Sequence, residues 1–182
     1  MIALPGLVLE TGRPDLARSI LRTAVRLMDQ GMLPNVLTET FSATGAVTGV
    51  FPQYNSVDAT LWLFEAVRQY YAVTSDKRFV EEIYPFLVEV LDRHIQGTRH
   101  AIRMDEADGL LFAGEPGVQL TWMDAKVDGQ VVTARIGKPV EVNALWYNAL
   151  RTMSRFAFEL DKPHGDYIRM AERVQTNFAR FL

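Results

Sequence analysis

Hydrophobic residues between positions 14 and 30 recur every three or four residues, which is the spacing of an amphipathic helix. One stripe consists of Leu16, Ile20, Ala24 and Leu27, and a second stripe of Ala17, Leu21, Val25 and Met28 widens it. Pro14 is suited to the first turn of a helix and Gly31 to the position just after its end. The pattern therefore predicts a helix over 14–30 that buries one broad face.

The same spacing predicts five further helical segments. They span residues 57–73, 75–84, 85–97, 140–160 and 164–182. Pro85 is expected to separate two of them, because proline cannot donate the helical hydrogen bond and clashes with the preceding turn. Six helices, joined alternately by short turns and long loops, are typical of stacked αα-hairpins. We therefore expect an all-α fold with its long loops gathered at one end, where a site could form.

Two long segments interrupt the helical pattern. Residues 32–53 are rich in threonine, glycine and proline, which predicts a loop with room for a short hairpin. Residues 98–139 contain seven glycines and prolines and a few short apolar runs, so we expect an irregular loop with small β pieces at about 100–138. The chain stops within an apolar segment at 178–182, which suggests a fragment of a longer protein.

Composition excludes several classes of function. The chain has 182 residues, of which 48% are hydrophobic and 23% charged, with a net charge of −3, so a phosphate-tracking nucleic-acid surface is not expected. It contains no cysteine, its three histidines are far apart, and no nucleotide-binding glycine motif occurs, so we expect neither a metal nor a cofactor. No apolar run is long enough to span a membrane and no secretory signal is present, which predicts a cytoplasmic protein.

The long loop before residue 140 holds the first candidate for chemistry. Trp122, Asp124 and Lys126 place an indole beside a carboxylate and an ammonium group. An indole stacks on the C–H face of a pyranose, and a carboxyl shielded by aromatic rings could donate a proton to a glycosidic oxygen. The alternative is a buried tryptophan beside a solvated aspartate, and local composition alone favours it.

Two further clusters lie where predicted helices begin. Tyr54 and Asp58 precede and open the apolar helix at 57–73, and Glu141 and Asn143 open the helix at 140–160. Asp58 and Tyr54 could face the same cavity as Asp124. Alternatively, Asp58 is an ordinary first-turn acid that interacts favourably with the helix dipole, as Glu141 is expected to be.

The order and spacing of these clusters resemble a known family. The matching segments are Tyr-Asn-Ser-Val-Asp-Ala-Thr-Leu-Trp at 54–62, Gln-Leu-Thr-Trp-Met-Asp-Ala-Lys at 119–126 and Lys-Pro-Val-Glu-Val-Asn-Ala-Leu-Trp-Tyr-Asn-Ala-Leu at 138–150. Together they are similar to the glucosidase domain of glycogen debranching enzymes, the amylo-α-1,6-glucosidase family, over essentially the whole chain. The chain departs from that pattern at Ala134, where the family usually has proline, and in a longer loop at 39–53.

The resemblance implies a fold and a reaction. The fold would be an (α/α)6 toroid, of which residues 1–182 form about half, and the reaction would be inverting hydrolysis of α-1,6-linked glucose at a glycogen or α-glucan branch point. Asp124 would be the general acid. The base, which in an inverting enzyme lies about 6.5–9.5 Å from the acid, would come from a later helix outside this chain.

The resemblance also implies the substrate-binding residues. Asp58 would hold the hydroxyls of the terminal glucose, and the pocket would be lined by Tyr54, Trp122, Lys126, Glu141 and Asn143. A half-toroid would expose apolar helix faces, so self-association through them is expected. A trehalase- or glucoamylase-like enzyme and a non-catalytic helical module that binds glucan or protein are the alternatives.

Overall fold

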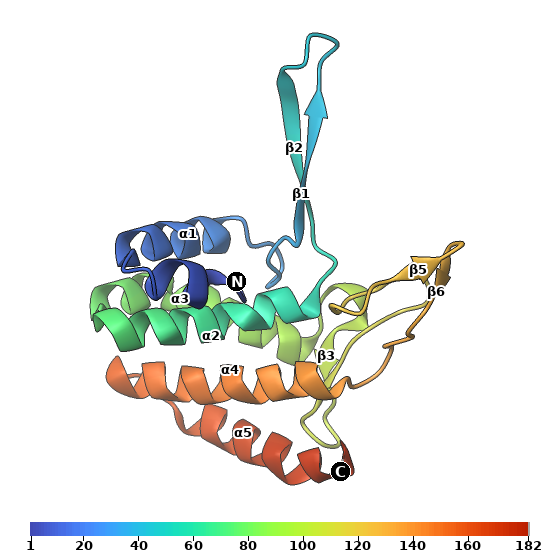
Figure 1. Cartoon of the computed structure of the whole chain (residues 1–182). Coiled ribbons are helices and arrows are strands. Elements are labelled where there is room, and N and C mark those ends of the chain that lie inside the picture. Colours follow the sequence, from blue (N-terminus) through green and yellow to red (C-terminus); the bar gives the residue numbers. More distant parts are fainter. Residues whose placement is uncertain (182) are drawn as a thin grey trace.

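The computed structural model describes residues 1–181, and most of them are helical. The main helices are α1 (Pro14–Arg26), α2 (Val57–Thr74), α3 (Lys77–Gln96), α4 (Val140–Glu159) and α5 (Gly165–Asn177). Three short helices, η1 (Pro5–Leu9), η2 (Arg99–Ala101) and η3 (Phe178–Phe181), accompany them. Helices α2, α4 and α5 lie in successive layers, with α1 and α3 packed on the other side of α2 (Figure 1). The predicted helical class is therefore confirmed.

Polar side chains fix where two of these helices begin. Ser56 is the N-cap of α2, and its hydroxyl accepts a hydrogen bond from the Ala59 N–H at 3.1 Å. Asp76 caps α3 in the same way, accepting from the Phe79 N–H at 3.0 Å. Each cap pairs one of the backbone donors that the first turn of a helix leaves free.

The predicted helix break at Pro85 is wrong, because α3 continues through it from Lys77 to Gln96. Pro85 is exposed, so water can satisfy the carbonyl that loses its helical partner. On the opposite face, Ile83, Leu87 and Leu91 are fully buried. Burial of such side chains stabilises a helix enough to outweigh an interior proline, which costs about 3 kcal/mol.

Two predicted helix ends also lie elsewhere. Helix α1 ends at Arg26 rather than at residue 30, because Gln30 and Gly31 both have positive φ and form a turn closed by a bridge between Asp29 and Met32. Gly31 lies against the side chain of Arg93, where a β-carbon would have no room. At the other end, α5 stops at Asn177 and the tighter helix η3 follows.

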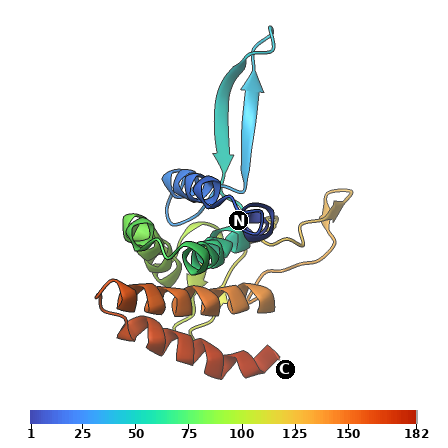
Figure 2. The same cartoon turned by 60° about the vertical axis from the view of Figure 1, so that its left-hand side comes forward.

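A long β-hairpin projects from the helical body (Figures 1 and 2). Its strands are β1 (Val36–Phe41) and β2 (Val47–Gln53), which pair antiparallel from Val36 opposite Gln53 to Phe41 opposite Val47. The sequence indicated room for only a short hairpin in this segment. Its side chains are almost all exposed, including Phe41 and Phe51, so no other described part of the chain covers it.

The segment before α4 contains the small β pieces that the sequence predicted. Strands β3 (Arg103–Met104) and β4 (Leu111–Phe112) pair with each other, as do β5 (Lys126–Val127) and β6 (Gln130–Val131). The β3–β4 pair packs on the helices, whereas the β5–β6 pair lies at the tip of an arm that extends away from them (Figure 1).

The hydrophobic core lies between α2, α3 and α4. Its largest fully buried side chains include Phe64, Phe79, Trp146 and Phe156. His94 of α3 is buried with them, and its ring stacks on that of Trp146 at a centroid distance of 6.2 Å. No helix within residues 1–181 combines the length and the apolar character that crossing a membrane requires.

Candidate active site

A cavity of about 750 Å3 lies where α2 and α4 begin. Both helices start at this end, so their N-terminal turns form one wall and the loop around residues 119–124 forms another. The cavity brings together four of the residues that the sequence predicted, namely Asp58, Trp122, Asp124 and Glu141. Three others, Tyr54, Lys126 and Asn143, do not line it.

Asp58 joins the first turn of α2 to the loop. One carboxylate oxygen, Oδ1, accepts from the Ala59 N–H at 2.8 Å and from the Ser56 hydroxyl. The other oxygen, Oδ2, accepts from the backbone N–H of Trp122 at 3.0 Å. The Val57 N–H donates to the Leu120 carbonyl at 2.9 Å, so two hydrogen bonds fix the loop against the end of the helix.

Trp122 and Asp124 project from this loop beside the cavity. Trp122 is 66% exposed as a residue, and Asp124 is exposed as well. The sequence predicted a carboxyl shielded by aromatic rings, and the described residues do not provide that shielding. No hydrogen bond or ion pair to the Asp124 carboxylate occurs within residues 1–181, so both of its oxygens face the cavity or solvent.

Glu141 lines the cavity from the first turn of α4. Its carboxylate is paired with the Arg135 guanidinium, which also donates to the Met123 sulfur at 3.2 Å. Arg135 therefore connects the start of α4 to the residue that precedes Asp124.

Tyr54 supports the base of the hairpin instead of the cavity. Its hydroxyl donates to the Leu27 carbonyl at the end of α1 at 2.9 Å, and the Arg99 guanidinium lies over its ring at 4.7 Å. Its own carbonyl accepts from His100 Nε2 at 3.1 Å. With all of these groups occupied, Tyr54 holds α1, the hairpin and η2 together.

Asn143 and Lys126 also make contacts elsewhere. Asn143 is fully buried; its side-chain oxygen accepts from the Leu111 N–H at 2.6 Å, and its amide donates to the Leu111 and Pro139 carbonyls. It thus attaches α4 to β4. Lys126 donates to the Gly117 carbonyl at 3.3 Å on the exposed arm.

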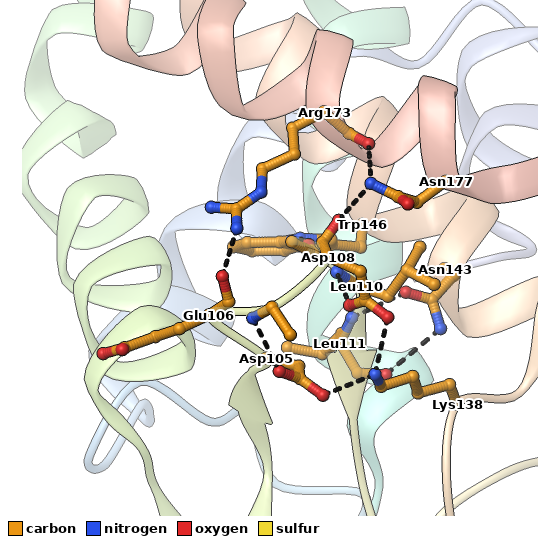
Figure 3. Close-up of polar contacts among 12 residues, drawn as sticks. Asp105, Glu106, Asp108, Leu110, Leu111, Lys138, Asn143, Trp146, Arg173 and Asn177 are labelled. Carbon is orange, nitrogen blue, oxygen red and sulfur yellow. Dashed lines mark hydrogen bonds and ion pairs between the residues drawn. The ribbon is translucent and has the colours of Figure 1, made fainter.

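A partly buried polar cluster anchors the other side of the α4 N-terminus (Figure 3). Lys138 donates to Asp105 at 2.6 Å and to Asp108, whose side chain is 2% exposed, at 2.8 Å. The hydrogen bond from Lys138 is the main reason that the pKa of Asp105 is lowered. Burial opposes the charge on Lys138, but its hydrogen bonds to the two aspartates outweigh this and raise its pKa.

The segment at residues 105–110, which contains Asp105 and Asp108, is held to α4 and α5 by further contacts. Trp146 Nε1 donates to the Gly109 carbonyl at 3.1 Å, Asn177 donates to the Asp108 carbonyl at 3.0 Å, and Arg173 donates to the Glu106 carbonyl (Figure 3). Because residues 105–110 are attached to α4 and α5 in this way, Lys138 and the residues that follow it have a fixed position. This arrangement sets where Glu141 enters the cavity.

Among the polar residues that line the cavity and that sequence reasoning missed, Asn55 and Thr121 stand out. The Asn55 Oδ1 and Thr121 Oγ1 atoms are buried and have no hydrogen-bond partner within the described residues. Thr121 is only 6% exposed as a residue. Unpaired buried polar atoms are costly, and a bound ligand could pair them. The sequence did contain a signal for these two residues, because each lies within a motif that already contained a candidate site residue.

The cavity therefore combines an exposed indole with a carboxylate and two polar oxygens that have no partner in the described part of the chain. These groups suit a neutral ligand with many hydroxyls, because the indole offers a stacking face and the oxygens offer hydrogen-bond partners. No group of three histidine, aspartate or glutamate side chains arranged to hold a metal ion occurs in the described part of the chain.

Comparison with known proteins bears on the family to which the chain belongs. The family model described as amylo-alpha-1,6-glucosidase matches residues 1–182. The glycogen debranching enzyme of Saccharomyces cerevisiae is 24% identical to this chain in an alignment that is 204 residues long. The alignment covers 82% of this chain. The match covers only 13% of the length of that relative.

Proposed function

Because the chain belongs to the amylo-alpha-1,6-glucosidase family, we propose that its cavity binds the terminal glucose of an α-1,6 branch on an α-glucan and that Asp124 is the general acid of its hydrolysis. The observation that carries the proposal is that Trp122 and Asp124 line the same cavity and that neither Asp124 carboxylate oxygen has a protein partner among the described residues. The family assignment favours this reaction over that of a trehalase- or glucoamylase-like enzyme.

In the proposed mechanism, the glucose ring lies against the Trp122 indole. Asp124, in its protonated form, donates its proton to the glycosidic oxygen as the bond to the anomeric carbon breaks, and the rest of the glucan leaves as an alcohol. Water attacks the anomeric carbon from the opposite face and gives inversion. We propose that the carboxylate that deprotonates this water lies on a helix outside residues 1–182.

We further propose that the helices form about half of an (α/α)6 toroid. Helices α2 and α4 both begin at the cavity, as inner helices around a central pocket would. Leu16 and Ile20 of α1 and Leu27 just after it form an exposed apolar stripe, which neighbouring helices of a complete toroid would cover. In isolated form, the chain is expected to self-associate through this face.

Saturation-transfer NMR with malto-oligosaccharides and their α-1,6-branched analogues tests sugar binding by this chain. Trp122→Ala should abolish the transfer, because it removes the stacking face. Phe158→Ala is the matched control, since Phe158 is an exposed aromatic residue on α4 that does not line the cavity. Transfer that persists in Trp122→Ala, or is absent from the folded wild-type chain, would contradict the proposed site.

A further inference from the structure

The position of Asp124 depends on contacts made by its neighbours. Its own carboxylate has no protein partner within residues 1–181, and the chain beyond it runs into the exposed arm that carries β5 and β6 (Figure 1). The preceding residues are attached to the helices, through the Leu120 carbonyl and the Trp122 N–H. Whatever holds Trp122 and Met123 therefore also sets where the Asp124 carboxyl lies.

Asp58 is one of these holding groups, and its carboxylate is largely occupied. It accepts from the Ala59 N–H, from the Ser56 hydroxyl and from the Trp122 N–H. A carboxylate has about four lone-pair sites, so roughly one remains for a sugar hydroxyl. Such an arrangement suits a residue that positions the loop better than one that recognises several hydroxyls.

Glu141 holds the loop from the other helix. It is paired with Arg135, and Arg135 reaches the Met123 sulfur at 3.2 Å. Asp58 and Glu141 occupy the first turns of α2 and α4, where the partial positive charge of the helix end favours a carboxylate.

We propose that Asp58 and Glu141 are positioning residues, which fix the loop at Trp122, Met123 and Asp124 between two helix ends. Asp58 acts through the backbone of Trp122, and Glu141 acts through Arg135 on Met123. The consequence for catalysis rests on the proposed function, because it assumes that Asp124 is the acid. The positioning itself is a property of the chain without substrate.

Amide hydrogen exchange at Trp122 tests the proposed role of Asp58. It is followed by NMR in the full 182-residue chain without sugar. Asp58→Ala removes the acceptor, so the exchange rate of the Trp122 N–H should rise about tenfold or more, as expected for loss of a bond to a charged group. Asp58→Asn keeps the shape and a weaker acceptor, so a smaller rise is expected. Should Asp58→Ala fail to fold, the Asp58→Asn variant still tests the same bond.

Ser56→Ala is the matched control. It removes the N-cap of α2 and one donor to Asp58, yet leaves the bond from Trp122 to Oδ2 in place. Trp122 exchange in Ser56→Ala should therefore stay within about twofold of wild type, since its acceptor is retained. Equal acceleration in Ser56→Ala and Asp58→Ala, or no acceleration in Asp58→Ala, would overturn the assignment.

The proposed role of Glu141 is tested separately, by the NMR signal of the Met123 methyl group. Glu141→Gln should shift the Met123 methyl resonance, because it releases Arg135 from its partner, while the methyl of the fully buried Met153 stays unchanged. An unmoved Met123 signal would overturn this half. A subsequent malto-oligosaccharide titration separates the two ideas: failure of wild type to bind sugar contradicts the proposed function and leaves the exchange result intact.

Discussion

Buried His94 provides the sharpest test of the energetics of the core. The residue lies on α3 and is completely buried, with Nδ1 donating to the Val90 carbonyl at 2.8 Å. Its Nε2 has no hydrogen-bond partner within the described residues. Because burial penalises the imidazolium, the pKa of His94 is lowered from 6.5 to about 4, and the Val90 carbonyl recovers only part of that loss.

The sign of the pH dependence follows from these two pKa values. Below pH 6.5 the unfolded chain binds a proton at this position, whereas the folded chain stays neutral until about pH 4. The neutral, buried histidine therefore favours folding fully above pH 6.5, and this contribution is lost as the pH falls towards 4. The difference in pKa corresponds to a loss of about 3 kcal/mol in the free energy of unfolding.

Urea unfolding at pH values between 4.5 and 7.5 measures this contribution. The wild type should lose stability steeply between pH 6.5 and 4.5, and His94→Gln should lose less over the same range because it cannot titrate. His164→Gln is the control, since His164 lies partly exposed at the start of α5 and its replacement should preserve the wild-type slope. Identical slopes in wild type and His94→Gln would refute the reasoning.

Three further substitutions test other parts of the account. Pro85→Ala should raise the free energy of unfolding by about 1–3 kcal/mol in urea titrations, because it restores a helical N–H at an exposed position; a decrease would contradict the explanation of α3. Lys138→Met should lower it by about 2 kcal/mol, because buried Asp108 loses a charged donor, and an unchanged value would show that the cluster in Figure 3 adds little. Thr121→Val should leave folding intact but weaken malto-oligosaccharide binding about tenfold by calorimetry, and unchanged affinity would exclude its hydroxyl as a sugar contact.

The sequence predicted the helices well where the apolar spacing was continuous. The segment at 57–73 shows this, because Ser56 caps it and its apolar side chains are buried on several sides. Pro85 shows the opposite case, since a local rule against proline was outweighed by burial on the other face of α3. That burial depends on tertiary packing, which one-dimensional spacing does not contain.

The candidate site was predicted in part, for a related reason. Motifs at the starts of α2 and α4 and in the loop between them each contribute residues to one cavity, because the fold brings these three places together. They did not distinguish residues that face the cavity from residues that hold its walls. Tyr54 and Asn143 belong to the second kind, and their roles follow from long-range partners such as Leu27 and Leu111.

The most direct test of the central claim is the dependence of Asp124→Asn on the leaving group, measured in an active protein that contains this sequence. A general acid matters most when the leaving group is a poor one, as in an α-1,6-linked glucan. We predict a loss of about 100-fold or more in glucose release from the branched glucan and a much smaller loss with an activated aryl glucoside. Equal losses on both substrates would contradict the assignment of Asp124 as the acid.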